Sequence, residues 1–220
     1  IESLIISTAI VVSSTFTVNN LTLGTNAVMN VNQVTVSNLM VNPNSNATIK
    51  GTVIVQGNLT LQAGSVLTVS SMNIVQGNLT LPAGSMLTVS SMSVAGDLTL
   101  LSGARLAHAQ NSATRQYWLN LTVGGNLDLQ SGATIYLDGL GYAGGGAYAS
   151  GFGPGYGGRY TDCGSGAGHG GAGGAGASWP GVGDGGGGIV YDNLTEPIDL
   201  GSGGGGGAAG AGGNGGGALI

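Results

Sequence analysis

A twenty-residue repeat occupies the middle of this chain. From Gly57 the sequence reads GNLTLQAGSVLTVSSMNIVQ, and from Gly77 it reads GNLTLPAGSMLTVSSMSVA. Further copies open at Gly96 and Gly125, and looser ones at residues 20 and 38. A unit repeated at a fixed period is typical of folds in which each copy stacks on its neighbours. The repeat therefore predicts an elongated array over at least residues 20–137.

Within one repeat, apolar and polar residues alternate in three short runs. The apolar positions are Leu59, Leu61, Leu67, Val69, Met72 and Ile74. A period of two indicates β-strands, and residues 62–65 and 70–71 supply corners between the runs. The pattern predicts an all-β fold, a parallel β-helix (β-solenoid) with about three short strands per coil of about 20 residues.

Side chains one period apart should lie above one another along such a solenoid. We expect Leu59 to stack on Leu79 and Leu98, Met72 to stack on Met92, and Thr60, Thr80 and Thr99 to form an outer polar strip. An antiparallel sandwich would also show short alternating strands. It would not require the fixed interval, so the solenoid is the favoured interpretation.

Composition narrows the possible partners. Only 6% of the residues are charged, and four basic residues stand against nine acidic ones, so nothing predicts binding to the phosphates of nucleic acid. Residues 1–12 are apolar but include Glu2 and fall short of the roughly 20 residues of a membrane span. We expect a first strand layer there rather than the remnant of a signal peptide. The single cysteine, Cys163, is either a free thiol or half of an intermolecular disulfide.

The repeat is interrupted twice. Residues 107–116 read AHAQNSATRQ and predict a loop bulging from one corner. Most of the 47 glycines follow Leu137. We therefore expect solenoid coils over residues 1–137, a glycine-rich insertion over 138–217, and a returning solenoid strand over 218–220.

Glycine-rich chain can be a flexible linker or a set of extended, polyproline-II-like rods packed on the flank of the solenoid. Aromatic residues recur through the insertion and favour packing. They are Tyr142, Tyr148, Phe152, Tyr156, Tyr160, Trp179 and Tyr191.

Three segments of this region carry a resemblance. The strings GSGAGHGGAGG, YDNLTEPIDLGSGGGG and GGNGGGALI resemble, in this order, a glycine-rich module of large secreted and cell-surface parallel β-helix proteins of algae, oomycetes, plants and bacteria. The resemblance covers roughly residues 125–220, and its specific part is the second string. It implies an extracellular structural or adhesive role and transfers no catalytic signature.

Six Asn-X-Thr sequons are present, at Asn20, Asn46, Asn58, Asn78, Asn120 and Asn193. They predict N-linked glycans, which would hydrate a surface so poor in charge. The same motif also arises for structural reasons, when a turn-favouring Asn precedes an inward Leu and an outward Thr.

The sequence contains few candidate catalytic or ligand-binding residues. Asp162, Cys163 and His169 could suggest a nucleophile but lie in glycine-rich chain, and His108 is expected at the surface. The stretch GAGHGG at 166–171 lacks a following helix that would bind phosphate, and Gly183-Asp184-Gly185 is one fragment of a calcium repeat that needs tandem copies.

One further set, Asp192, Glu196 and Asp199, could hold a calcium ion. We nevertheless predict no catalytic site, no metal site, no cofactor and no enzymatic activity.

The chain is thus predicted to be a secreted or cell-surface structural protein. Neither residues 1–18 nor residues 218–220 carry a polar cap, so copies of the chain are expected to stack head to tail into a filament. The alternative is a monomeric adhesin segment that binds surface glycans through its aromatic, glycine-rich flank. Ice binding through the threonine strip and cleavage of polysaccharides are less favoured.

Overall fold

The computed structural model describes residues 1–74, 76–159, 163–176, 186–208 and 210–220. They form two compact units, one of residues 1–107 and 120–136 and one of residues 108–119 and 137–220. The regular structure is β throughout, and the described residues contain no helix. The strands are β1 (Ser3–Ile6), β2 (Ala9–Leu23), β3 (Val28–Val41), β4 (Asn46–Leu61), β5 (Val66–Ile74), β6 (Leu79–Leu81), β7 (Met86–Val94), β8 (Leu98–Leu100), β9 (Arg105–Ala107), β10 (Asn120–Val123), β11 (Leu127–Leu129) and β12 (Thr134–Ile135).

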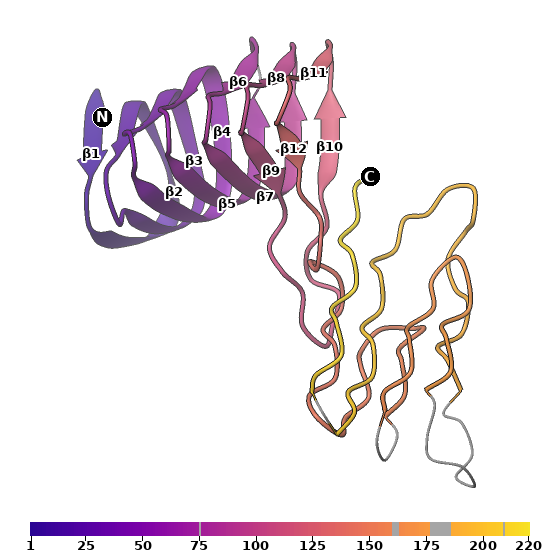
Figure 1. Ribbon diagram of the computed structural model, residues 1–220. Coiled ribbons are helices and arrows are strands. Elements are labelled where there is room, and N and C mark those ends of the chain that lie inside the picture. Colours follow the sequence, from indigo (N-terminus) through magenta and orange to yellow (C-terminus); the bar gives the residue numbers. More distant parts are fainter. Residues whose placement is uncertain (75, 160–162, 177–185, 209) are drawn as a thin grey trace, which may run out of the picture. The chain divides into compact units, whose positions relative to one another are not determined.

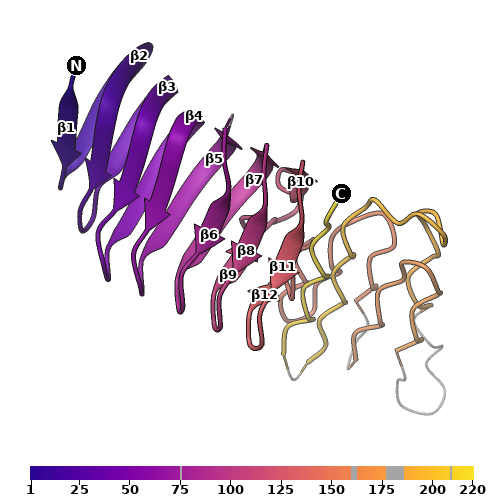
Figure 2. The same cartoon turned by 90° about the horizontal axis from the view of Figure 1, so that it is seen from above.

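The strands of the first unit stack in parallel. One sheet has the order β1-β2-β3-β4-β5-β7-β9-β12, with β10 also paired to β7, and a second has the order β11-β8-β6. Strands of successive coils therefore lie side by side in chain order (Figures 1 and 2). The predicted fold is confirmed, since this unit is a parallel β-solenoid of about five turns.

The register follows the sequence repeat. Met72 pairs with Met92, and Leu79 pairs with Leu98, as predicted. Leu59 pairs with Leu39 of the preceding coil, and its strand β4 contacts β6, which contains Leu79. β1 pairs in parallel with the end of β2, so the expected first strand layer is also present.

The burial pattern shows how each coil turns. In β5 the buried residues are Leu67, Val69, Met72 and Ile74, as the alternation predicted. The phase of burial shifts by one residue at positions 70–71, yet the strand continues through them. The predicted corner is therefore a bend within a strand. In β4 all three runs form one strand of 16 residues.

A tight turn recurs at the other corner of every coil. Six four-residue turns close with a hydrogen bond from the fourth N–H to the first carbonyl, at residues 24–27, 42–45, 62–65, 82–85, 101–104 and 130–133. The third residue always has positive φ and is Asn26, Asn44, Gly64, Gly84, Gly103 or Gly132. This is the signature of a type II turn, in which the third position requires glycine or asparagine. The turn explains the recurring AGS and SGA motifs.

The second unit is held together by backbone hydrogen bonds around a central segment, residues 201–206. Gly203 donates to Phe152, Gly204 to Gly213, and Gly205 to Ser165. A Cβ atom at Gly203 would overlap the Ala143 carbonyl, so close approach of backbones explains the glycine there. These contacts lie within the second unit itself, so packing on the flank of the solenoid and polyproline-II geometry both stay predictions.

The loop after β9 belongs to this second unit. Asn111 donates its backbone N–H to the Leu140 carbonyl, and Ala143 donates to the Ser112 carbonyl. At the far end of the loop, Leu119 forms a parallel bridge with Leu219. Residues 108–119 are therefore a packing partner of the glycine-rich chain rather than a simple bulge.

The repeated turn gives a first prediction. Nothing lies within 4 Å of a Cβ atom built at Gly84, whose φ is 70°. Replacement by alanine therefore adds only backbone strain, and G84A should lower the free energy of unfolding by about 1–2 kcal/mol. G84N should stay closer to wild type, because asparagine occupies this position in two other coils. Urea denaturation of the three proteins measures the difference, and equal losses for G84A and G84N would contradict the turn assignment.

Candidate functional site

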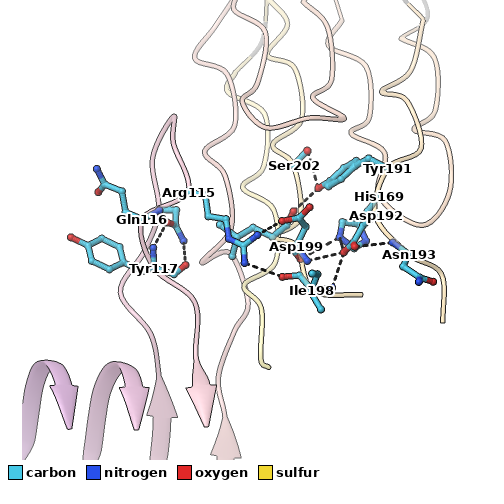
Figure 3. Close-up of polar contacts among 12 residues, drawn as sticks. Arg115, Gln116, Tyr117, His169, Tyr191, Asp192, Asn193, Ile198, Asp199 and Ser202 are labelled. Carbon is cyan, nitrogen blue, oxygen red and sulfur yellow. Dashed lines mark hydrogen bonds and ion pairs between the residues drawn. The ribbon is translucent and has the colours of Figure 1, made fainter. Parts of the chain in front are cut away.

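Polar side chains of the second unit gather around the loop of residues 192–199, the most specific part of the resemblance (Figure 3). Asp192 begins the loop with a φ of 67°. Its carboxylate accepts backbone N–H groups from Asn193 at 2.7 Å, Ile198 at 2.9 Å and Asp199 at 2.7 Å. These hydrogen bonds, first that from Asp199, lower the pKa of Asp192. The Asp192 carboxylate thus closes the loop on itself.

The loop after β9 reaches the same place through Arg115. Its guanidinium forms an ion pair with Asp199 and donates to the Ile198 carbonyl at 3.2 Å. The guanidinium also lies over the Trp118 ring, 4.7 Å from the centroid. Arg115 therefore ties residues 108–119 to the loop of residues 192–199, a role that the sequence did not predict.

Tyr191 connects this network to the central glycine segment. Its ring packs edge-on against His169, with centroids 4.7 Å apart. Its hydroxyl donates to the Leu200 carbonyl and accepts from the Ser202 hydroxyl at 2.9 Å. Burial is the main reason that the pKa of Tyr191 is raised. The Tyr191 hydroxyl thus forms two hydrogen bonds, and its raised pKa keeps it in the neutral form.

The three acids suggested as calcium ligands each have a different environment. Asp192 accepts backbone N–H groups, Asp199 pairs with Arg115, and Glu196 is exposed. In the described ranges, no group of three His, Cys, Asp or Glu side chains is placed to hold a metal ion.

Two of the three residues suggested as a nucleophile site, Cys163 and His169, lie among the described residues. His169 has its Nε2 atom 3.4 Å from Asp192, and Cys163 is exposed. Asp162 lies outside the described residues, as do Tyr160, Trp179 and the fragment at 183–185. No helix follows residues 166–171 in the part of the chain that the structure describes.

His108 is not at the surface, and that expectation was wrong. Only 1% of the residue is exposed, because residues 108–119 pack into the second unit. Nδ1 lies 2.7 Å from the Ala109 carbonyl, while Nε2 is buried without a hydrogen-bond partner and faces the Cα of Gly217. Loss of hydration lowers the pKa of His108, against a smaller opposite effect of the Ala109 carbonyl.

The outer face of the solenoid carries a ladder of amides. Asn38 donates its side-chain N–H to Asn20 at 2.9 Å, and Asn58 donates to Asn38 at 3.2 Å. Further along, Asn78 accepts from the backbone of Asp97 at 2.8 Å. The asparagine that opens each repeat therefore has a structural use, whether or not it carries a glycan.

The six sequon asparagines are all exposed but lie in different settings. Asn20, Asn46, Asn58 and Asn120 are in strands, and Asn78 directly precedes one. Asn193 lies in a loop, where its amide oxygen accepts from the Thr195 backbone at 2.9 Å and hydroxyl at 2.8 Å. In the threonine strip, Thr80 pairs with Thr99, which then pairs with Asp128.

Two comparisons with known proteins gave no match, and one did. The family model described as Haemagglutinin repeat matches residues 11–74 and 54–131. These two overlapping matches cover more than half of the chain and lie over the coils from β2 to β11. Neither a curated protein nor a solved structure matches the chain. No helix of the described residues is long and apolar enough to cross a membrane.

His108 generates a second prediction. Because its pKa is lower in the folded than in the unfolded chain, the unfolded chain binds more protons between the two values. The contribution of His108 is thus fully present above the unfolded value of about 6.5 and is lost as the pH falls below it. The midpoint of thermal unfolding should fall between pH 7.5 and pH 5, and less so in H108L. Parallel curves for the two proteins would contradict the buried neutral imidazole.

Proposed function

Since the chain belongs to the haemagglutinin repeat family, we propose that it is a structural β-solenoid module of an extracellular filament, built by end-to-end stacking of copies. The family is found in secreted and cell-surface proteins and is typically structural or adhesive. This supports an extracellular or cell-surface location and a role without catalysis.

The observation that carries the proposal is the parallel register in which like strands of successive coils pair, because any coil with the same side-chain pattern can extend such a stack. In the described unit, residues 9–18 of β2 pair on one side only, with β3. Val12, at a core position of β2, is only half-buried, although its partner Val31 is buried. At the other end, Leu127 is 43% exposed, although its partner Leu98 is completely buried.

Another coil would cover both ends in the way that each coil covers the next. Unpaired strand edges readily add strands from another chain. A head-to-tail contact, repeated, yields a fibre. A copy of the same chain fits best, because its coils carry the same twenty-residue register.

Glycans are the second part of the proposal, with Asn193 as the favoured carrier. A glycan on Asn58 would replace an amide hydrogen at the nitrogen that donates to Asn38, in a ladder whose layers are about 4.8 Å apart. At Asn193 the contacts to Thr195 use the amide oxygen and leave the nitrogen out of them.

A glycan-binding adhesin segment is the second candidate. It is favoured by the exposed aromatic side chains of the glycine-rich unit, Tyr148, Phe152 and Tyr156.

The stacking proposal predicts that V12K blocks assembly. Val12 points toward the core and is half-buried, and its partner Val31 is buried, so a lysine at position 12 would be buried under any further coil. Wild-type protein should form filaments in negative-stain micrographs as its concentration rises, and V12K should remain as single particles. The matched control is N73K, which adds the same charge on an outward position of a middle strand. Wild-type protein that stays monomeric throughout, or V12K filaments like those of wild type, would overturn the proposal.

The glycan proposal predicts a loss of mass on enzymatic deglycosylation. We expect peptide mapping of protein from the cells that make it to place a glycan on Asn193, and N193Q to remove that signal. N58Q is the matched control and should leave the glycan mass unchanged. An intact mass equal to that of the bare chain, or glycans found on the ladder asparagines instead, would contradict this assignment.

A further inference from the structure

One tight turn of the glycine-rich unit displays three apolar side chains. The turn reads GFGPGYG over residues 151–157. Its exposed members are Phe152, Pro154 and Tyr156, and its buried members are Gly151, Gly155 and Gly157. Phe152 is 43% exposed and Tyr156 is 50% exposed. We call the three exposed residues the aromatic turn.

Backbone hydrogen bonds fix the aromatic turn from beneath. Tyr156 donates to the Gly153 carbonyl at 3.3 Å, which closes a turn with Pro154 at its second position. Gly203 of the central segment donates to the Phe152 carbonyl at 2.8 Å. The rings are thus presented on a backbone that is already ordered, which lowers the entropic cost of binding a ligand.

A recess adjoins the turn. Its volume is about 330 Å³, and it is lined by Pro154, Tyr156, Gly158, Gly186, Gly187, Gly188 and Ile189. Ile189 is 68% exposed, so the apolar surface continues beyond the recess. Among the described residues no charged one lines it, and three consecutive glycines form one wall.

We propose that the aromatic turn and this recess bind a neutral glycan. Aromatic faces carry partial negative charge and attract the C–H groups on the face of a sugar ring. Glycine walls have no side chains to shield the backbone, so sugar hydroxyls can reach its polar groups. The described lining is uncharged and matches a neutral ligand better than a sulfated or sialylated one. This inference rests on the proposed extracellular role and names the partner class of that role.

The test is binding of the purified full chain to an array of neutral oligosaccharides of glucose, galactose, mannose and N-acetylglucosamine, with sulfated and sialylated glycans on the same array. Wild-type protein should bind one or more neutral glycans. The double variant F152A/Y156A should bind at least tenfold more weakly, and Y156F should retain binding because it keeps the ring.

A second variant fills the recess without removing a ring. A Cβ atom at Gly158 would lie 3.6 Å from the Ser165 hydroxyl, an ordinary contact, so G158V should fold and still lose binding. Y117A is the matched control, since Tyr117 is an exposed aromatic residue outside the recess. It should bind like wild type.

Three results would overturn the proposal. They are wild-type protein that binds no neutral glycan, binding by F152A/Y156A or G158V that is as strong as that of wild type, and binding confined to the charged glycans. If no glycan binds and the double variant instead loses concentration-dependent association, a second copy occupies this surface. V12K is measured on the same array and should bind like wild type, so failure of stacking and failure of glycan binding are distinguishable.

Discussion

Hydrogen bonding between successive coils is the constraint on which the solenoid depends. A coil of about twenty residues is too small to bury its own apolar face against the entropy lost on ordering. The neighbouring coil supplies both the missing hydrogen bonds and the missing apolar contacts. This requires an apolar side chain at the same core position of each coil, as Val53, Met72 and Met92 show. The repeat in the sequence follows from that requirement.

Glycine serves two different physical purposes in the two units. In the solenoid it supplies the positive φ of a turn, as at Gly84, and asparagine replaces it in two coils. In the second unit it permits backbones to approach one another, as at Gly203 against Ala143. The first use tolerates asparagine because only a dihedral angle is at stake. The second tolerates no side chain, because the space of a Cβ atom is filled by a carbonyl group.

The polar network of the second unit holds the glycine-rich chain together through its few charged groups. Arg115 joins the loop after β9 to Asp199, and Asp192 closes the loop of residues 192–199. The sequence alone suggested these acids as calcium ligands and predicted that His108 lies at the surface. The sequence does not reveal these contacts, because Arg115 and Asp199 are 84 residues apart and no local pattern indicates which charged residues pair.

The sequence by itself determined the parallel solenoid, its inward and outward residues and its layer register, because a period of twenty and an alternation of two follow directly from stacking and strand geometry. It also marked the turns, since positive φ selects glycine and asparagine. Only the tertiary structure decided that residues 70–71 bend a continuous strand, that residues 108–119 pack with the glycine-rich chain, and that His108 is buried. Those outcomes depend on contacts between segments that share no repeat, and such contacts leave no periodic trace in a sequence.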